Sequence, residues 1–192
     1  IYEALIDSEP GNAREKVALK VFKGSMTSDG QPQSEIDTTL MAGSHTHLIR
    51  VKAQINDHPE GLPVLVMEQL SSDFVVLAGP PSLESCTRDV YAESFQLDLT
   101  NCLKILEAVA DTANHLHQKG IMHGDLYAHN VLHNAANQLY LGDFGAATAL
   151  DALPQWQQQQ AKAQEIRAFG YFLADLLALV PAGNPSSALL QA

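Results

Sequence analysis

The chain has 192 residues, of which 46% are hydrophobic and 17% are charged, so it can build a packed core in one domain or in two small lobes. Its 22 acidic residues outnumber 11 basic ones, and the formal net charge of −11 argues against general nucleic-acid binding and against docking on an anionic membrane. The two cysteines, Cys86 and Cys102, provide neither a disulfide framework nor a four-ligand zinc pattern. We therefore expect free thiols in a reducing, cytoplasmic compartment.

The ends of the chain carry no visible targeting signal. No apolar run reaches the ~18 residues that a bilayer span needs, and no basic segment followed by an apolar one marks a secretory leader. The chain begins with Ile1 rather than methionine and ends at Ala192 in a helix-like run. We expect it to be part of a longer protein, truncated at both ends.

The first 70 residues predict strands and one helix. Residues 32–42 favour a helix because Ile36, Leu40 and Met41 fall on one side and Gly43 follows as a terminator. Strands are expected at residues 1–6, 17–22, 47–54 and 63–68.

The rest of the chain is mainly helical. Residues 71–98 are rich in Ser, Pro and Gly and predict an irregular connection with at most one short helix. An amphipathic helix then ends at Gly120, and its apolar stripe is Leu99, Leu103, Leu106, Ala110, Ala113 and His117. Short strands are expected at 130–133 and 138–141. The last helix carries the stripe Ile166, Phe169, Leu173, Leu176, Leu177 and Val180. This order predicts an α+β fold with a boundary near residue 70.

Three segments carry side chains suited to phosphate chemistry. The strand Val-Ala-Leu-Lys ends at Lys20, the loop His-Gly-Asp-Leu-Tyr-Ala-His-Asn contains Asp125 and Asn130, and the string Asp-Phe-Gly begins at Asp143. Asn130 and Asp143 offer the hard oxygen atoms that magnesium prefers. Lys20 can offset phosphate charge, and Asp125 can accept the proton of an incoming hydroxyl. Phosphoryl transfer needs little more, because positioning and charge stabilisation supply most of its catalysis.

In this order and spacing the three segments resemble the signature set of the protein kinase-like superfamily. The strings around Asp125 and Asp143 are similar to bacterial Ser/Thr-type kinase domains, and to plant ones, often linked to leucine-rich repeats. The resemblance implies a two-lobed fold. A small antiparallel β-sheet lobe with one helix would occupy residues 1–69, including the start of the hinge, and a mainly helical lobe would occupy 70–192. We refer to them as the strand lobe and the helical lobe.

The resemblance also implies roles for individual residues, with ATP and Mg²⁺ as cofactors. Lys20 would contact the α- and β-phosphates and pair with Glu35, although an unpartnered surface carboxylate is the competing interpretation of Glu35. Asp125 would be the base or the residue that orients the acceptor. Asn130 and Asp143 would ligate magnesium. The adenine would be bound by Ala18, Met67, Glu68, Leu70 and Leu132, with Met67 at the back of the pocket and the backbone of Glu68 and Leu70 at the hinge.

Several histidines have a structural interpretation. The resemblance places His123 under Phe144, and His117 falls on the apolar side of the long helix as a core histidine. A zinc site built from His123, Asp125, His129 and His133 is disfavoured, because their spacing matches no helical ligand pair.

The chain departs from the family pattern at several positions. Gly124 replaces the arginine that pairs with an activation-segment phosphate, and Thr148 is the sole hydroxyl residue between Gly145 and Glu165. We therefore expect no control by activation-loop phosphorylation. Tyr127 stands where Ser/Thr kinases carry lysine, and protonated His129 is a candidate substitute.

Three functions are consistent with these residues. A Ser/Thr-type protein kinase is favoured, and the alternatives are a small-molecule kinase of the aminoglycoside or choline type and a pseudokinase that binds or scaffolds. The acceptor is accordingly a protein or a small hydroxyl compound, and the residues leave the oligomeric state open.

Overall fold

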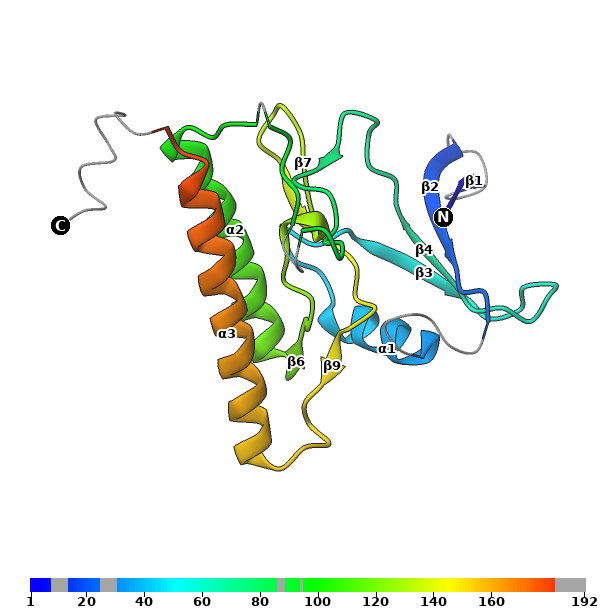
Figure 1. Ribbon diagram of the computed structural model, residues 1–192. Coiled ribbons are helices and arrows are strands. Elements are labelled where there is room, and N and C mark those ends of the chain that lie inside the picture. Colours follow the sequence, from blue (N-terminus) through cyan, green and yellow to red (C-terminus); the bar gives the residue numbers. More distant parts are fainter. Residues whose placement is uncertain (8–13, 25–30, 86–88, 94, 182–192) are drawn as a thin grey trace.

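The computed structural model describes residues 1–7, 14–24, 31–85, 89–93 and 95–181. The chain forms an antiparallel sheet with one helix at one end and a pair of long helices at the other (Figure 1). Cys86 and residues 182–192 lie outside the described residues, whereas Cys102 is a buried free thiol. None of the described helices is both long and apolar enough to cross a membrane.

The sheet of the strand lobe has four antiparallel strands in the order β1-β2-β4-β3. Its members are β1 (Tyr2–Asp7), β2 (Arg14–Val21), β3 (Val51–Ile55) and β4 (Val64–Glu68). Helix α1 (Pro32–Ala42) packs on it through a small core of Phe22, Ile36 and Leu65. The helix has the predicted bounds because Pro32 suits its first turn and Gly43 ends it with a φ of 68°.

The strand predicted at 47–54 begins only at Val51. The backbone before Val51 pairs with β8 (Leu139–Leu141) of the helical lobe instead. Leu141 donates a hydrogen bond to the His47 carbonyl (2.9 Å), and Leu48 forms a β-bridge with Leu141. The segment before β3 therefore ties the sheet to the helical lobe instead of extending it.

The helical lobe is built on two helices that run side by side, α2 (Leu99–Gln118) and α3 (Gln155–Ala178) (Figure 1). Between them in sequence lie β6 (Ile121–Met122), the 3₁₀ turn η1 (Ala128–Asn130), β7 (Val131–His133), β8 (Leu139–Leu141) and β9 (Thr148–Ala149). The connection before α2 contains β5 (Val75–Val76), and the described part of residues 71–98 contains no helix. Strands pair as β5-β7-β8 and β6-β9.

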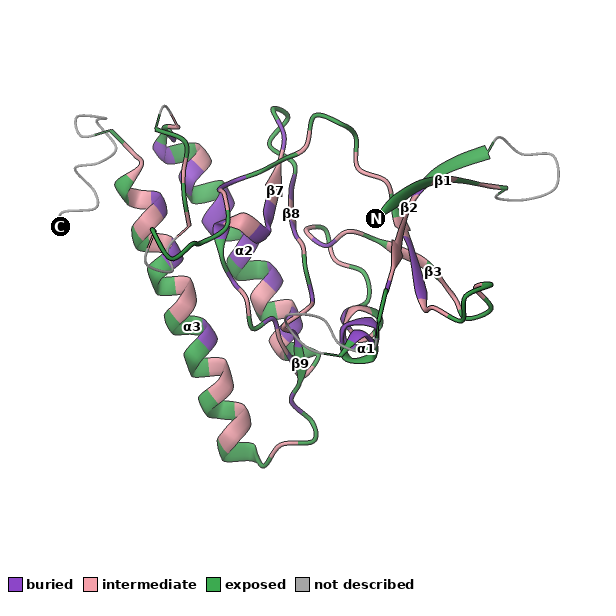
Figure 2. Cartoon of the chain, turned by 45° about the vertical axis from the view of Figure 1, so that its right-hand side comes forward, coloured by how far each residue is buried: buried purple, intermediate pink, exposed green. Residues whose placement is uncertain are grey.

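The predicted apolar stripe of α2 is rotated from the face that the helix buries. Leu103 is 49% exposed, whereas the buried face is made by Leu99, Cys102, Ile105, Leu106, Ala108, Val109, Thr112 and Leu116. Ile105 and Val109 present more apolar area than the alanines of the predicted stripe, so their burial decides the orientation. On α3, Ile166 is likewise 63% exposed (Figure 2 shows exposed and intermediate residues alternating along α3, with few buried ones).

Candidate active site

Lys20 and Glu35 meet at the inner side of the strand lobe. Lys20 lies on β2 opposite Leu65 of β4, and its Nζ donates a hydrogen bond to Glu35 Oε1 on α1. Glu35 is only 6% exposed, and a buried carboxylate is costly without a charged partner. The ion pair predicted for these residues is therefore present, and the interpretation of Glu35 as an unpartnered surface residue is wrong.

Asp143 faces the same lysine from the helical lobe. Its Oδ1 lies 3.6 Å from Lys20 Nζ and accepts a hydrogen bond from the Gly145 amide (3.1 Å). Asp143 has a φ of 52°, in the left-handed region that residues other than glycine rarely adopt, although aspartate does so more readily than most. Such strain is kept where the surroundings hold it, and here it turns the carboxylate toward Lys20.

Asp125 and Asn130 form a second group on the loop before β7. Asn130 Nδ2 donates to Asp125 Oδ2 (2.8 Å) and to the Asp125 carbonyl (2.9 Å), so the side chain closes the loop on itself. Asn130 is 7% exposed, while the Asp125 side chain is 37% exposed. The side-chain oxygen of Asn130, Oδ1, takes no part in these two bonds, and the Asp125 carboxylate can reach solvent.

The backbone of Gly142 joins the two groups. Its amide donates to the Asn130 carbonyl (2.8 Å), and its own carbonyl accepts from His123 Nε2 (3.0 Å). His123 is fully buried, and its ring lies 5.3 Å from that of Phe144. Burial holds the pKa of His123 below its ordinary value, despite the nearby Glu165 carboxylate that acts in the opposite direction. His123 is thus a neutral packing and hydrogen-bonding residue, as expected.

Glu165 on α3 anchors the loop from below. Its Oε1 accepts a hydrogen bond from the Gly124 amide (2.8 Å), and its Oε2 lies 2.6 Å from His117 Nε2 on α2. Gly124 has a φ of 81°, and a Cβ built there would lie 2.4 Å from the Ala146 carbonyl oxygen. The loop therefore has no room for any side chain at position 124.

A small cavity of about 50 Å³ lies where the lobes meet. It is lined by Lys20, Glu35, Thr39, Ile49, Leu65, Met67, Leu141, Gly142, Asp143 and Phe144. Three of the predicted ATP-binding residues, Lys20, Met67 and Asp143, are therefore brought together. The other expected adenine contacts do not line this cavity, although the structure describes them: Ala18 pairs with Met67 across β2 and β4, Glu68 ends β4, Leu70 follows it, and Leu132 lies on β7 near Gly142.

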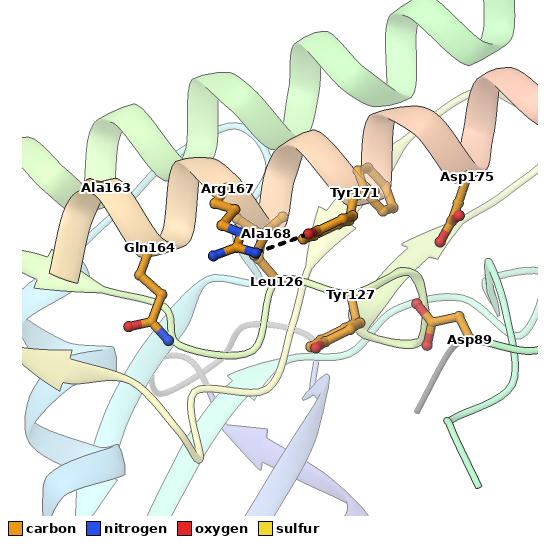
Figure 3. A pocket seen from close by; sticks show the side chains of 10 residues that line it. Asp89, Leu126, Tyr127, Ala163, Gln164, Arg167, Ala168, Tyr171 and Asp175 are labelled. Atoms are coloured by element: carbon orange, nitrogen blue, oxygen red, sulfur yellow. Dashed lines mark hydrogen bonds between the residues drawn. The ribbon is translucent and has the colours of Figure 1, made fainter. Parts of the chain in front are cut away.

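A larger groove of about 700 Å³ runs between the loop and α3. Figure 3 shows Tyr127 on one side of it, with Arg167 and Tyr171 of α3 on the other. Arg167 Nη2 donates to the Tyr171 hydroxyl (3.2 Å). The groove is lined by Leu126 and Tyr127, which follow Asp125 in the loop, and it is separate from the cavity that Lys20 lines.

Asp89 is a site residue that the sequence did not reveal. Its carboxylate accepts hydrogen bonds from the Ala128 amide (2.6 Å) and from His129 Nδ1 (2.7 Å). No periodicity or motif surrounds Asp89, because it lies in the irregular connection of residues 71–98. Only a contact distant in sequence identifies it.

Residues 10–168 match the protein kinase domain family, which is most of the chain. The chain belongs to this family. It is 26% identical over 148 residues to fibroblast growth factor receptor 1 of Pleurodeles waltl, covering 74% of this chain and 18% of that protein. It is 28% identical over 152 residues to the probable serine/threonine-protein kinase fhkC of Dictyostelium discoideum, covering 76% and 23%. The chain is also 28% identical, over 150 residues, to the serine/threonine-protein kinase PITSLRE of Drosophila melanogaster, covering 76% of this chain and 15% of that protein.

The chain thus spans about a fifth of the length of these relatives, and the kinase-like two-lobed fold expected from the sequence is confirmed. Among the described residues no group of three or more His, Cys, Asp or Glu side chains is arranged to hold a metal ion, so the disfavoured zinc site gains no support. For magnesium, by contrast, the kinase domain offers the Asp143 carboxylate and the Asn130 amide oxygen, which are suitable donors.

Proposed function

We propose that this kinase domain transfers the γ-phosphoryl group of ATP, with Mg²⁺, to a hydroxyl group of a protein, in the manner of a Ser/Thr-type kinase. One observation carries the proposal. Lys20 Nζ bonds Glu35 of the strand lobe and lies 3.6 Å from Asp143 of the helical lobe, so one cation faces the carboxylate expected to hold the metal. Both lobes thereby contribute to one phosphate-binding position.

Each site residue has one role in this proposal. Lys20 binds phosphate oxygens while Glu35 holds its ammonium group in place. Asn130 and Asp143 would hold Mg²⁺, which neutralises phosphate charge when it is bound. Asp125 orients the acceptor hydroxyl and receives its proton at the carboxylate, which Asn130 keeps in position.

We also propose how the adenine is bound. Ala18 and Met67 lie opposite each other on β2 and β4. Glu68 is the last residue of β4, and Leu70 lies two residues beyond it. The base would lie against this edge of the strand lobe, with Leu132 of the helical lobe on its other side. Backbone groups at Glu68 and Leu70 would supply the hydrogen bonds.

The proposed kinase would not be switched by phosphorylation between Asp143 and α3. An arginine cannot occupy position 124, because a Cβ there would lie 2.4 Å from the Ala146 carbonyl oxygen. The residue that would pair with an activation-segment phosphate is thus excluded by the backbone itself. Thr148, the sole hydroxyl residue between Gly145 and Glu165, belongs to β9, which pairs with β6.

A small-molecule acceptor is the second candidate. Two observations favour it: the glycine at position 124, and the short segment of ten residues, 145–154, that separates Phe144 from the start of α3 at Gln155. A short segment offers little platform for an extended peptide. A cytoplasmic location, inferred from a sequence with only two cysteines, is proposed with either acceptor.

The test is transfer from labelled ATP with Mg²⁺ to a panel of generic proteins and of amino alcohols. Label on protein serine or threonine supports the proposal, and its loss in Asp125→Asn shows that the site is responsible. Label on small hydroxyl compounds alone would replace it with the second candidate. Tight ATP binding without any transfer would make the chain a nucleotide-binding pseudokinase.

A further inference from the structure

Asp89 is buried against the loop that carries Asp125 and Asn130. Its side chain is 5% exposed, yet both of its oxygens have donors: Oδ2 accepts from the Ala128 amide (2.6 Å) and Oδ1 from His129 Nδ1 (2.7 Å). A buried carboxylate is stable when its oxygens accept hydrogen bonds, and such charge-assisted bonds are stronger than neutral ones. The turn η1 is therefore fastened to a residue that lies about forty positions earlier in the chain.

The segment around Asp89 is itself fixed. Val90 and Gly79 exchange two backbone hydrogen bonds of 2.8 and 3.0 Å. Leu77 donates from its amide to the Val131 carbonyl (2.8 Å), at the start of β7. Asp89 is thus held relative to the strand that directly follows the loop, so it is a rigid support rather than a passing surface contact.

His129 passes this support on to Asp125. Its Nδ1 is bonded to Asp89, its ring stacks on Tyr127 at 5.7 Å, and its Nε2 lies 3.4 Å from Asp125 Oδ2. The same Oδ2 accepts from Asn130 Nδ2 (2.8 Å). One oxygen of Asp125 therefore lies between two side chains, and the His129 ring is in turn bonded to Asp89, outside the loop.

We propose that Asp89 is a positioning residue of the active site, which fixes η1 and, through His129, sets the orientation of the Asp125 carboxylate. We call the set Asp89, Ala128 and His129 the Asp89 clamp. The proposal rests on the phosphoryl-transfer function proposed above. Residues that orient catalytic groups through a second contact commonly affect activity by about 10- to 100-fold when they are changed.

The first measurement does not depend on activity. Amide hydrogen exchange of residues 125–130 is compared in the unmodified chain, in Asp89→Asn and in Asp111→Asn. Asp111 is a matched control, because its carboxylate contacts a histidine ring, His45, at 3.2 Å but lies away from the loop. We expect the Ala128 amide to exchange about tenfold or more faster in Asp89→Asn. Asp111→Asn should leave it unchanged.

The second measurement separates positioning from folding. We expect Asp89→Asn to lower kcat about tenfold or more while the KM for ATP changes less than twofold, because Lys20 and the hinge bind the nucleotide away from the clamp. A general loss of structure would change both parameters. Asp111→Asn should preserve kcat.

Two variants of His129 separate the contact of its ring with Asp89 from the contact of its ring with Asp125. Asn places its amide near the position of Nδ1 and Gln near that of Nε2, so His129→Asn keeps the Asp89 contact and His129→Gln keeps the Asp125 contact. Both should lower kcat, since Asp89 can orient Asp125 only when both nitrogens of the His129 ring keep their contacts. In the Asp89→Asn background, His129→Gln should have a smaller effect than in the unmodified chain, because the charge-assisted contact that it removes is already weakened.

The outcomes distinguish this proposal from the proposed function. If the unmodified chain transfers no phosphate but Asp89→Asn accelerates exchange at Ala128, the clamp is retained and the proposed function is lost. Unchanged exchange at Ala128 would overturn the clamp. So would faster exchange with a kcat equal to that of Asp111→Asn, or fully additive effects of Asp89→Asn and His129→Gln.

Discussion

The two lobes hold their reactive side chains in different ways. In the strand lobe, Lys20 is positioned by one side-chain ion pair with Glu35. In the helical lobe, the loop around Asp125 is held by buried groups on several elements, including His123, Glu165 and Asp89. A contact between two side chains can be broken by a shift of α1, whereas the loop must lose several buried hydrogen bonds to move. We therefore expect the position of Lys20 to change more easily than that of the loop around Asp125.

The largest effect is expected where the two lobes meet. Asp143→Asn keeps the size of the side chain but removes the charge that faces Lys20, so we expect phosphoryl transfer to fall by about 100-fold or more. Transfer from labelled ATP, with varied magnesium concentration, measures it. Activity equal to that of the unmodified chain would contradict the role of Asp143 and the convergence of the lobes.

Lys20→Met tests the strand-lobe side of the comparison. Methionine retains the apolar stem but cannot pair with Glu35, so we expect kcat to fall about tenfold or more. Nucleotide affinity should fall less, because the hinge backbone is proposed to hold the base. Calorimetric titration with ATP beside steady-state kinetics separates the two. An equal loss in affinity and in kcat would place the binding energy at Lys20 instead.

Gly124→Ala tests the rigidity of the helical lobe. The added Cβ would lie 2.4 Å from the Ala146 carbonyl oxygen, and the φ of 81° is unfavourable for alanine. We expect a loss of about 2–3 kcal/mol in the free energy of unfolding, measured by urea denaturation. Gly170→Ala, on α3 where an added Cβ meets nothing within 4 Å, is the matched control and should not destabilise the chain. Equal stabilities would show that the loop can shift.

Lowering the pH should weaken the contact between the end of α1 and α2. Burial, and next the neighbouring His115, lower the pKa of His45 from 6.5, while Asp111 acts in the opposite direction and His47 adds a small lowering effect. A histidine whose pKa is lowered on folding contributes stability above pH 6.5, and this contribution is lost as the pH falls below that value. The melting temperature should therefore decline from pH 7.5 to 5.5.

The matched variant for this titration is His45→Gln, which cannot titrate. It should reduce the decline without abolishing it, since burial also lowers the pKa of His123 and of His133. An identical decline in both proteins would exclude His45 as a cause.

The smallest effect is expected at Thr148. Its side chain is exposed on β9, and we expect Thr148→Ala to change basal transfer by less than twofold. Kinetic measurement on protein purified with and without phosphatase treatment checks this. A large loss in the variant, or activation that depends on phosphate at Thr148, would show that the helical lobe is regulated at this segment.

The sequence predicted those parts of the site that have local patterns. Helix α1 followed from the spacing of Ile36, Leu40 and Met41 and from Gly43 as its terminator. Lys20, Asp125 and Asp143 followed from short motifs with fixed spacing. Periodicity was less reliable for α2. An apolar stripe counts alanine in the same way as a larger residue, whereas the apolar area of Ile105 and Val109 decides which face of the helix is buried.

Asp89 and the backbone before β3 could not be predicted for a different reason. Asp89 makes its contacts about forty residues away, and His47 accepts its hydrogen bond from Leu141. Such partners are chosen by the packing of the lobes, and nothing in the adjacent residues encodes them.

Gly142 uses both of its peptide groups, one toward Asn130 and the other toward His123. If the backbone rotated at this residue to swing Asp143 out of the cavity, it would break both bonds in a single event. Departure of Asp143 is thus expected to be all-or-none, with two discrete populations rather than a continuum of intermediate positions. In that case inactivation of the site would behave as a cooperative switch governed by the two peptide groups that flank one residue.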